Sequence, residues 1–148
     1  MNVEEIIKTS KKIPLEPRTV IHLELVHNRI SEIMTGALKP FEVSMQQFNV
    51  LRILRGQQGN PANLSTINER MVTKMSNTTR LVDKLIAKGH VSRCICPSNR
   101  RKVEILITEH GLDALAQMDK ALEEAHSNIL KNFDKKELEQ LNQLLDKF

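Results

Sequence analysis

Five polar side chains on one face of residues 76–88 have the chemistry to hydrogen-bond with the edges of nucleic-acid bases. Apolar side chains recur in this segment at three- and four-residue spacing, which predicts a helix with one buried stripe. The side chains left on its outward face are Ser76, Asn77, Thr79, Arg80 and Lys84. Such side chains can read base edges in the major groove of duplex DNA, and the positive end of a helix favours phosphate. We therefore take these five residues as candidate DNA contacts.

The elements around this face indicate a helix-turn-helix. A short amphipathic helix is expected over residues 64–71, and after a polar turn the second helix runs from Ser76 to Lys88 and stops at Gly89. Upstream, residues 44–47 have the pattern of a capping box, which predicts the start of another helix that ends at Gly56.

A β-hairpin is expected next, with strands over residues 91–96 and 102–107. Alternating apolar residues in the second strand would pack on the helices, so the polar turn between the strands must project. Arg100 and Arg101 end this turn and could enter the minor groove beside the major-groove helix. A helix-turn-helix followed by such a hairpin is a winged helix, and the fold class is mainly α.

Long helical regions at both ends predict a dimer. The apolar positions of the helix over residues 18–38 spread too widely for one buried stripe, so this helix has two faces to bury. An isologous dimer would bury them and would let two recognition helices read a palindrome. We expect a single domain over residues 1–148, with dimerisation helices at 18–38 and 110–148 and a DNA-binding lobe at 44–107. Thr108 and the capping box at residues 134–137 would start the C-terminal helices, and the first dozen residues would form an arm outside the core.

Charge and composition favour double-stranded DNA as the partner. The net charge is +4, and within residues 61–107 nine basic side chains outnumber three acidic ones by six, which leaves two net negative charges elsewhere. The chain has no Trp or Tyr, so it lacks the aromatic platforms on which single-stranded nucleic acids stack. With no apolar run of membrane-spanning length and acidic residues near the N-terminus, we expect a cytoplasmic protein with no membrane contact.

The chain resembles the MarR family of bacterial transcriptional regulators from about residue 18 to its end. The resemblance rests on the order and spacing of several motifs: Gln47–Leu54, Leu64–Ser65 with Glu69–Met71, Ser76–Leu85 with Lys88–Gly89, and the wing Asn99–Val103 followed by Leu106–Gly111. It implies a homodimeric winged-helix protein that binds palindromic promoter DNA and usually represses. It also implies relief of binding by a small effector, often aromatic or phenolic, or by cysteine oxidation, and an effector pocket where the long first helix and the helix after the wing meet the DNA-binding lobe.

Two positions depart from the family pattern. Asn99 stands where the family's wing usually has Asp, so Arg101 lacks the carboxylate that would orient it, although an amide oxygen can still accept its hydrogen bond. Val72 stands in the turn between the motif helices, where relatives often have Gly. The resemblance therefore implies DNA contacts at Asn99, Arg100 and Arg101 with a less preorganised wing.

Other functions remain as alternatives. Cys94 and Cys96 alternate along one strand and are expected to share a face with His90, which would suit a redox- or metal-responsive regulator, although the spacing is a poor zinc signature. We expect packing cysteines, with neither a metal nor a cofactor. An enzyme is disfavoured because no nucleophile elbow, zinc-protease motif or phosphate-binding glycine loop is present. A winged-helix module for protein contact or nonspecific DNA binding is the third reading.

Overall fold

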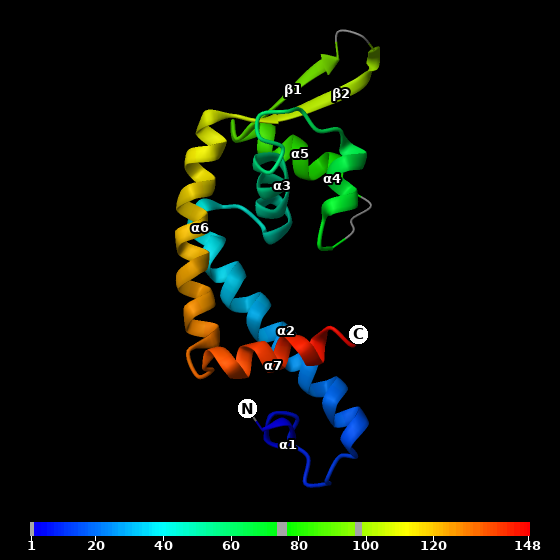
Figure 1. Cartoon of the computed structure of the whole chain (residues 1–148), viewed down its shortest axis with the longest axis vertical. Coiled ribbons are helices and arrows are strands. Elements are labelled where there is room, and N and C mark those ends of the chain that lie inside the picture. The colour runs from blue at the N-terminus through cyan, green and yellow to red at the C-terminus, as the bar shows by residue number, and fades with distance from the viewer. Residues whose placement is uncertain (1, 74–76, 97–98) are drawn as a thin grey trace. The chain divides into compact units, whose positions relative to one another are not determined.

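The computed structural model describes residues 2–73, 77–96 and 99–148, and for residues 95, 96 and 99–102 it describes the backbone alone. The described chain is mainly helical and has a two-stranded antiparallel hairpin, as the sequence predicts (Figure 1). Its helices are α1 (Val3–Ile6), α2 (Leu15–Leu38), the 3-10 turn η1 (Lys39–Phe41), α3 (Met45–Arg55), α4 (Leu64–Arg70), α5 (Thr78–Ala87), α6 (Glu109–Leu130) and α7 (Lys135–Leu145). Its strands are β1 (Val91–Cys96) and β2 (Asn99–Ile107).

The chain folds into two compact units. The terminal unit comprises residues 1–36 and 125–148, and the central unit comprises residues 37–124. Helices α2 and α6 each begin in one unit and end in the other. The central unit contains the predicted helix-turn-helix and hairpin.

Helix α3 is the buried centre of the central unit. The Ser44 hydroxyl accepts from the N–H of Gln47 at 3.2 Å, and the Ser44 N–H donates to Gln47 Oε1 at 2.9 Å, which confirms the predicted capping box. The helix reaches its C-cap at Gly56, also as predicted. Its Val50 and Leu51 are fully buried, and burial of such side chains stabilises a fold by about 1.5–3 kcal/mol each. Because α3 packs against α4, α5 and β2, it fixes the position of the helix-turn-helix and the hairpin.

The hairpin is anchored by a third segment that sequence patterns did not indicate. Val91 of β1 pairs with Ile107 of β2 at the base of the hairpin. On the other side of β2, the Ala62 N–H donates to the Ile105 carbonyl at 3.0 Å, and the Ile105 N–H donates back to the Ala62 carbonyl at 2.8 Å. Ile105 is fully buried. These two hydrogen bonds attach the loop before α4 to the hairpin.

The N-terminal segment differs from the predicted arm. It contains α1, and Val3 is fully buried. The Arg18 guanidinium donates to the Glu4 carboxylate at 2.8 and 3.1 Å, and this hydrogen-bonded pairing lowers the pKa of Glu4. Helix α2 begins at Leu15, before the predicted start at Arg18. Pro17 did not prevent this because the N–H groups of a helix's first turn have no acceptor within the helix.

The C-terminal helices begin with the predicted caps. The Thr108 hydroxyl accepts from the N–H of Gly111 at 2.9 Å at the start of α6. Helix α6 ends at Leu130, slightly earlier than expected. The Asp134 carboxylate accepts from the Glu137 N–H at 2.8 Å, and the Asp134 N–H donates to Glu137 at 2.9 Å, which confirms the second capping box.

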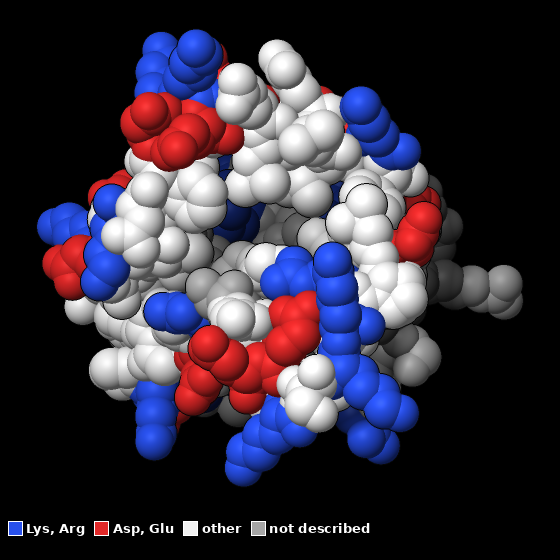
Figure 2. All heavy atoms as spheres, turned by 90° about the horizontal axis from the view of Figure 1, so that it is seen from below, with Lys and Arg blue, Asp and Glu red and all other residues white. Residues whose placement is uncertain are grey.

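The terminal unit leaves large apolar side chains exposed. On α2 these are Leu15, Val20, Leu23, Val26 and Ile30, and on α7 they are Leu141, Leu144 and Leu145. Figure 2 shows uncharged surface between clusters of acidic and basic side chains on the face seen from below. Large apolar side chains exposed on neighbouring turns of a helix make these surfaces candidates for an interaction site. Within the described residues, no helix has the length and hydropathy needed to span a membrane.

Candidate nucleic-acid interface

Helix α5 presents the predicted polar face. Val82 and Leu85 are fully buried beneath it, while Thr79, Arg80 and Lys84 are exposed. This separation follows from the apolar spacing, since residues three and four apart share one side of a helix. The arrangement places two cationic side chains and one hydroxyl along the outward surface of a single helix, where they can meet base edges and phosphates.

The start of α5 differs from the expected one. The helix begins at Thr78, and the exposed Asn77 occupies the N-cap position, although its side chain makes no capping hydrogen bond. Ser76, the first of the predicted contacts, lies outside the described residues. At the other end, the helix stops before Gly89, whose φ of +72° ends it in the predicted manner.

A polar contact sets the register between the two motif helices. The Thr78 hydroxyl, nearly buried, hydrogen-bonds to Asn68 Oδ1 of α4 at 3.2 Å. Asn68 was missed by sequence reasoning, although a polar residue among the inward positions of a short helix is a usable signal. The N-cap of α4 is Asn63, whose side chain accepts from the Thr66 N–H at 2.8 Å. The Thr78–Asn68 hydrogen bond thus joins α5 to α4, and the Asn63 cap fixes where α4 begins.

The wing differs from the prediction in where its strand begins. The second strand was expected from Lys102, but β2 begins at Asn99, so Asn99, Arg100 and Arg101 lie in the strand and not in the turn. Ile95 pairs with Val103, whereas its neighbour Cys96 pairs with Asn99. Residues 100–102 of β2 therefore have no β1 residue opposite them. Such an irregularity depends on cross-strand register, which local composition does not encode. The basic run is still at the far end of the hairpin from its base at Val91.

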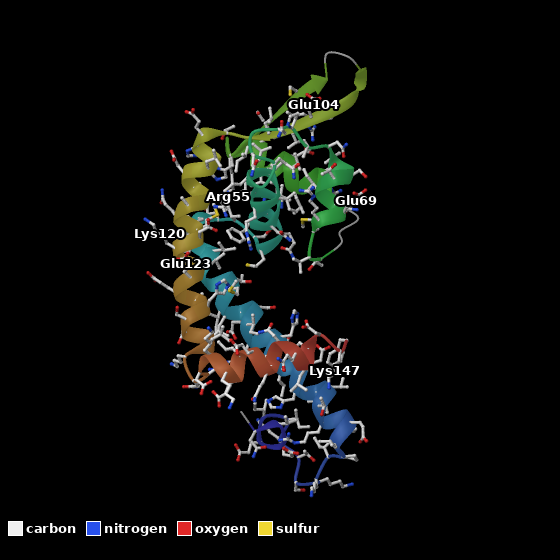
Figure 3. The ribbon with its side chains drawn as sticks, viewed as in Figure 1. Arg55, Glu69, Glu104, Lys120, Glu123 and Lys147 are labelled. Carbon is white, nitrogen blue, oxygen red and sulfur yellow. The ribbon has the colours of Figure 1, made fainter. Side chains whose placement is uncertain are left out.

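Some of the basic side chains in the central unit are neutralised. Arg93 of β1 donates to the Asp83 carboxylate of α5 at 2.8 Å, and Lys88 lies 3.2 Å from the Glu42 carboxylate. Arg55 of α3, which is labelled in Figure 3, pairs with the Asp119 carboxylate of α6. By contrast, Arg80 and Lys84 are exposed and make no ion pair with the described part of the chain. Their charge is therefore available to an anionic partner.

The expected shared face of Cys94, Cys96 and His90 is not formed by the described side chains. His90 is buried, but Cys94 is exposed, with its Sγ 3.8 Å from the Glu104 carbonyl oxygen. His90 precedes the first residue of β1, so strand alternation does not extend to it. The Cys96 side chain is outside the description. Among the described residues, no three His, Cys, Asp or Glu side chains are grouped to hold a metal ion.

The buried His90 instead contacts the start of α6. Its ring stacks on that of His110 with centroids 4.9 Å apart, and its Nδ1 is buried without a hydrogen-bond partner among the described residues. Burial lowers the pKa of His90, and the nearby His110 and Lys88 lower it further. The neutral imidazole thus joins the end of the candidate recognition helix to α6.

Comparison with known proteins places these elements in a family context. A profile of the MarR family matches residues 43–103, which span α3, the helix-turn-helix and most of the hairpin. The transcriptional repressor IacR of Pseudomonas putida is 26% identical over 124 residues, covering 84% of this chain and 73% of the relative. The multiple antibiotic resistance protein MarR of Escherichia coli K12 is 25% identical over 127 residues, covering 84% of this chain and 86% of the relative. A solved structure of a cysteine-to-serine mutant of MarR from E. coli with operator DNA shares the fold at a TM-score of 0.76 and 23% identity, covering 99% of this chain and 98% of that one.

Proposed function

We propose that this chain, whose residues 43–103 match the MarR family profile, is a homodimeric MarR-type repressor of palindromic promoter sites that is released by a small ligand. The observation that carries the proposal is the exposed cationic face of α5, where Arg80 and Lys84 lie above a buried apolar stripe and make no ion pair with the described residues. Sequence-specific regulators place such a helix in the major groove. We expect this protein to act where chromosomal DNA is found, in the cytoplasm.

Individual contacts follow from the chemistry of each side chain. Thr79 and Arg80 lie near the N-terminal end of α5 and are proposed to read bases, with Arg80 suited to bidentate contact with guanine. Asn77 and Ser76 are assigned to phosphate and base edges, and Lys84 to the backbone. The wing residues Asn99, Arg100 and Arg101 are assigned to the adjacent minor groove.

The dimer is proposed from the apolar surface of the terminal unit. Leucines on α7 and apolar side chains on α2 are exposed to solvent. A second copy of the chain would bury them against the same surface under two-fold symmetry. Two recognition helices in one dimer would contact half-sites about one helical turn apart, which is roughly 10 base pairs. The domain arrangement expected from the sequence, with residues 18–38 and 110–148 in dimerisation and 44–107 on DNA, is part of this proposal.

Repression and its release rest on relatives. IacR is named as a repressor. A further fold neighbour, an organohalide-sensing transcriptional regulator with a TM-score of 0.82 and 19% identity over 92% of this chain and 80% of that one, was solved in its 2,4-dichlorophenol-bound form. An aromatic or phenolic effector is therefore the class to test first. Such a ligand would act by binding one separation of the two recognition helices more tightly than the other.

The experiment is a binding selection from a random duplex pool, followed by titration of the selected sequence and a scrambled duplex at two salt concentrations. The expected result is an enriched palindrome bound by one dimer with steep salt dependence. Equal affinity for all duplexes would instead indicate nonspecific DNA coating, and absence of binding at moderate salt would indicate a module for protein contact. Phenolic compounds are then titrated against the complex, and release of DNA is the expected outcome.

A further inference from the structure

Asp83 is an acidic residue on the helix face proposed to meet DNA. It lies on α5 three residues after Arg80 and next to Lys84, and its side chain is 51% exposed. A carboxylate in this place would repel phosphate. Residues three apart on a helix are neighbours, so it could also capture the Arg80 guanidinium and withdraw it from the bases.

In the structure, the Asp83 carboxylate forms an ion pair with a residue of the hairpin. Arg93 Nη2 lies 2.8 Å from Asp83 Oδ1, while Arg80 makes no ion pair with the described residues. Arg93 is well placed for this contact because it pairs with the buried Ile105, whose backbone is hydrogen-bonded to Ala62 on the other side. Ile105 is thereby held between β1 and the segment at Ala62, which fixes the strand that lies opposite Arg93.

The ion pair between Arg93 and Asp83 contributes little to the stability of the fold. Both side chains are substantially exposed, and exposed ion pairs contribute little to the stability of a fold. Its position matters more, because it joins the recognition helix to the wing strand and removes the negative charge from the helix surface.

We propose that Arg93 is a positioning residue for DNA recognition: by holding Asp83, it keeps this carboxylate from Arg80 and from phosphate and leaves Arg80 free to read bases. The inference rests on the proposed DNA-binding function. It also assigns Asp83 a defined role, since its charge makes Arg93 necessary.

The test is a double-mutant cycle with Arg93→Gln, Asp83→Asn and their combination, measured on the selected operator and on scrambled duplex. Arg93→Gln should weaken operator binding by about tenfold, the size of one lost base contact, and should reduce the ratio of operator to scrambled affinity. The double variant has the same net charge as the wild type and should recover most of both quantities. Asp83→Asn alone should bind at least as tightly as the wild type, and Arg93→Lys should retain most of the affinity.

Matched controls separate this role from charge and folding. Lys88→Gln removes the same charge from another exposed ion pair, with Glu42, and should leave the operator preference unchanged. Thermal melting should show all variants folded. If the double variant binds as weakly as Arg93→Gln, Arg93 contacts DNA itself and the proposal is wrong. It is also overturned if Arg93→Gln binds as the wild type does, or if Asp83→Asn alone loses affinity. If the wild-type protein itself prefers no sequence, the proposed function is wrong, and this inference fails with it. That result is distinguishable, because a failure of the inference alone leaves the wild-type preference intact.

Discussion

The imidazole rings of His90 and His110 stack with their centroids 4.9 Å apart and their planes 26° from parallel, where the end of α5 and the base of the hairpin meet the start of α6. His90 N–H donates to the Leu85 carbonyl, and the Thr108 N–H donates to the His90 carbonyl, so the backbone here is held from both sides. The elements that present the DNA-binding face therefore join at one tightly packed point.

This junction predicts a loss of stability at mildly acidic pH. The native pKa of His90 lies below its usual value of 6.5 because the ring is buried beside His110 and Lys88. As pH falls through about 6.5, the unfolded chain binds a proton that the native ring resists, so the free energy of unfolding decreases. Thermal melting between about pH 8 and 5.5 should show this slope, and His90→Phe should flatten it. A wild-type melting temperature that is constant over this range would contradict the prediction.

Gly111 should not tolerate a side chain. A Cβ at this position would lie 2.1 Å from the backbone oxygen of His90, so the backbone would have to move. Gly111→Ala should lower the free energy of unfolding by at least about 2 kcal/mol, as is typical of overpacking. Gly36→Ala is the matched control in α2, where a Cβ meets nothing within 4 Å. That change should be neutral or stabilising by up to about 1 kcal/mol. Denaturant unfolding of both variants measures the difference, and equal stabilities would be inconsistent with the close approach at Gly111.

Arg80 and Lys84 should differ in what they contribute to DNA binding. Arg80→Ala should cost about 1–3 kcal/mol on the selected operator and relax the preference at one base position, because a base contact is lost. Lys84→Ala should weaken binding to all duplexes alike and lower the salt slope by about one, because a phosphate contact is lost. Titrations on operator and single-base variants at several salt concentrations distinguish the two. If Arg80→Ala alters neither affinity nor preference, its assignment is wrong.

Leu144 should support the proposed dimer. Its side chain is 58% exposed on α7 within the chain, so a charge there need not disturb the folded subunit. Leu144→Lys should shift the protein toward monomer and reduce operator affinity, because burying an ammonium group in an apolar interface is unfavourable. The control is Gln143→Lys, which adds the same charge at the neighbouring exposed position. Sedimentation equilibrium of both variants is the measurement, and a Leu144→Lys dimer as stable as the wild type would place the interface elsewhere.

The sequence by itself determined the features that depend on neighbouring residues. The capping boxes at Ser44 and Asp134 and the helix stop at Gly89 all formed as predicted. These features join residues only a few positions apart, and the periodicity of apolar side chains likewise decides which face of α5 is buried. The class of fold and the exposure of Thr79, Arg80 and Lys84 followed from such local signals.

Only the tertiary structure decided which distant groups meet. Sequence spacing did not reveal that Ala62 pairs with Ile105, that Arg93 forms an ion pair with Asp83, or that β2 begins at Asn99. Any of several basic side chains could have met that carboxylate, and the register of a hairpin depends on both strands together. The physical reason is that long-range contacts are selected by the packing of the whole central unit, to which each residue's own pattern contributes only a small part.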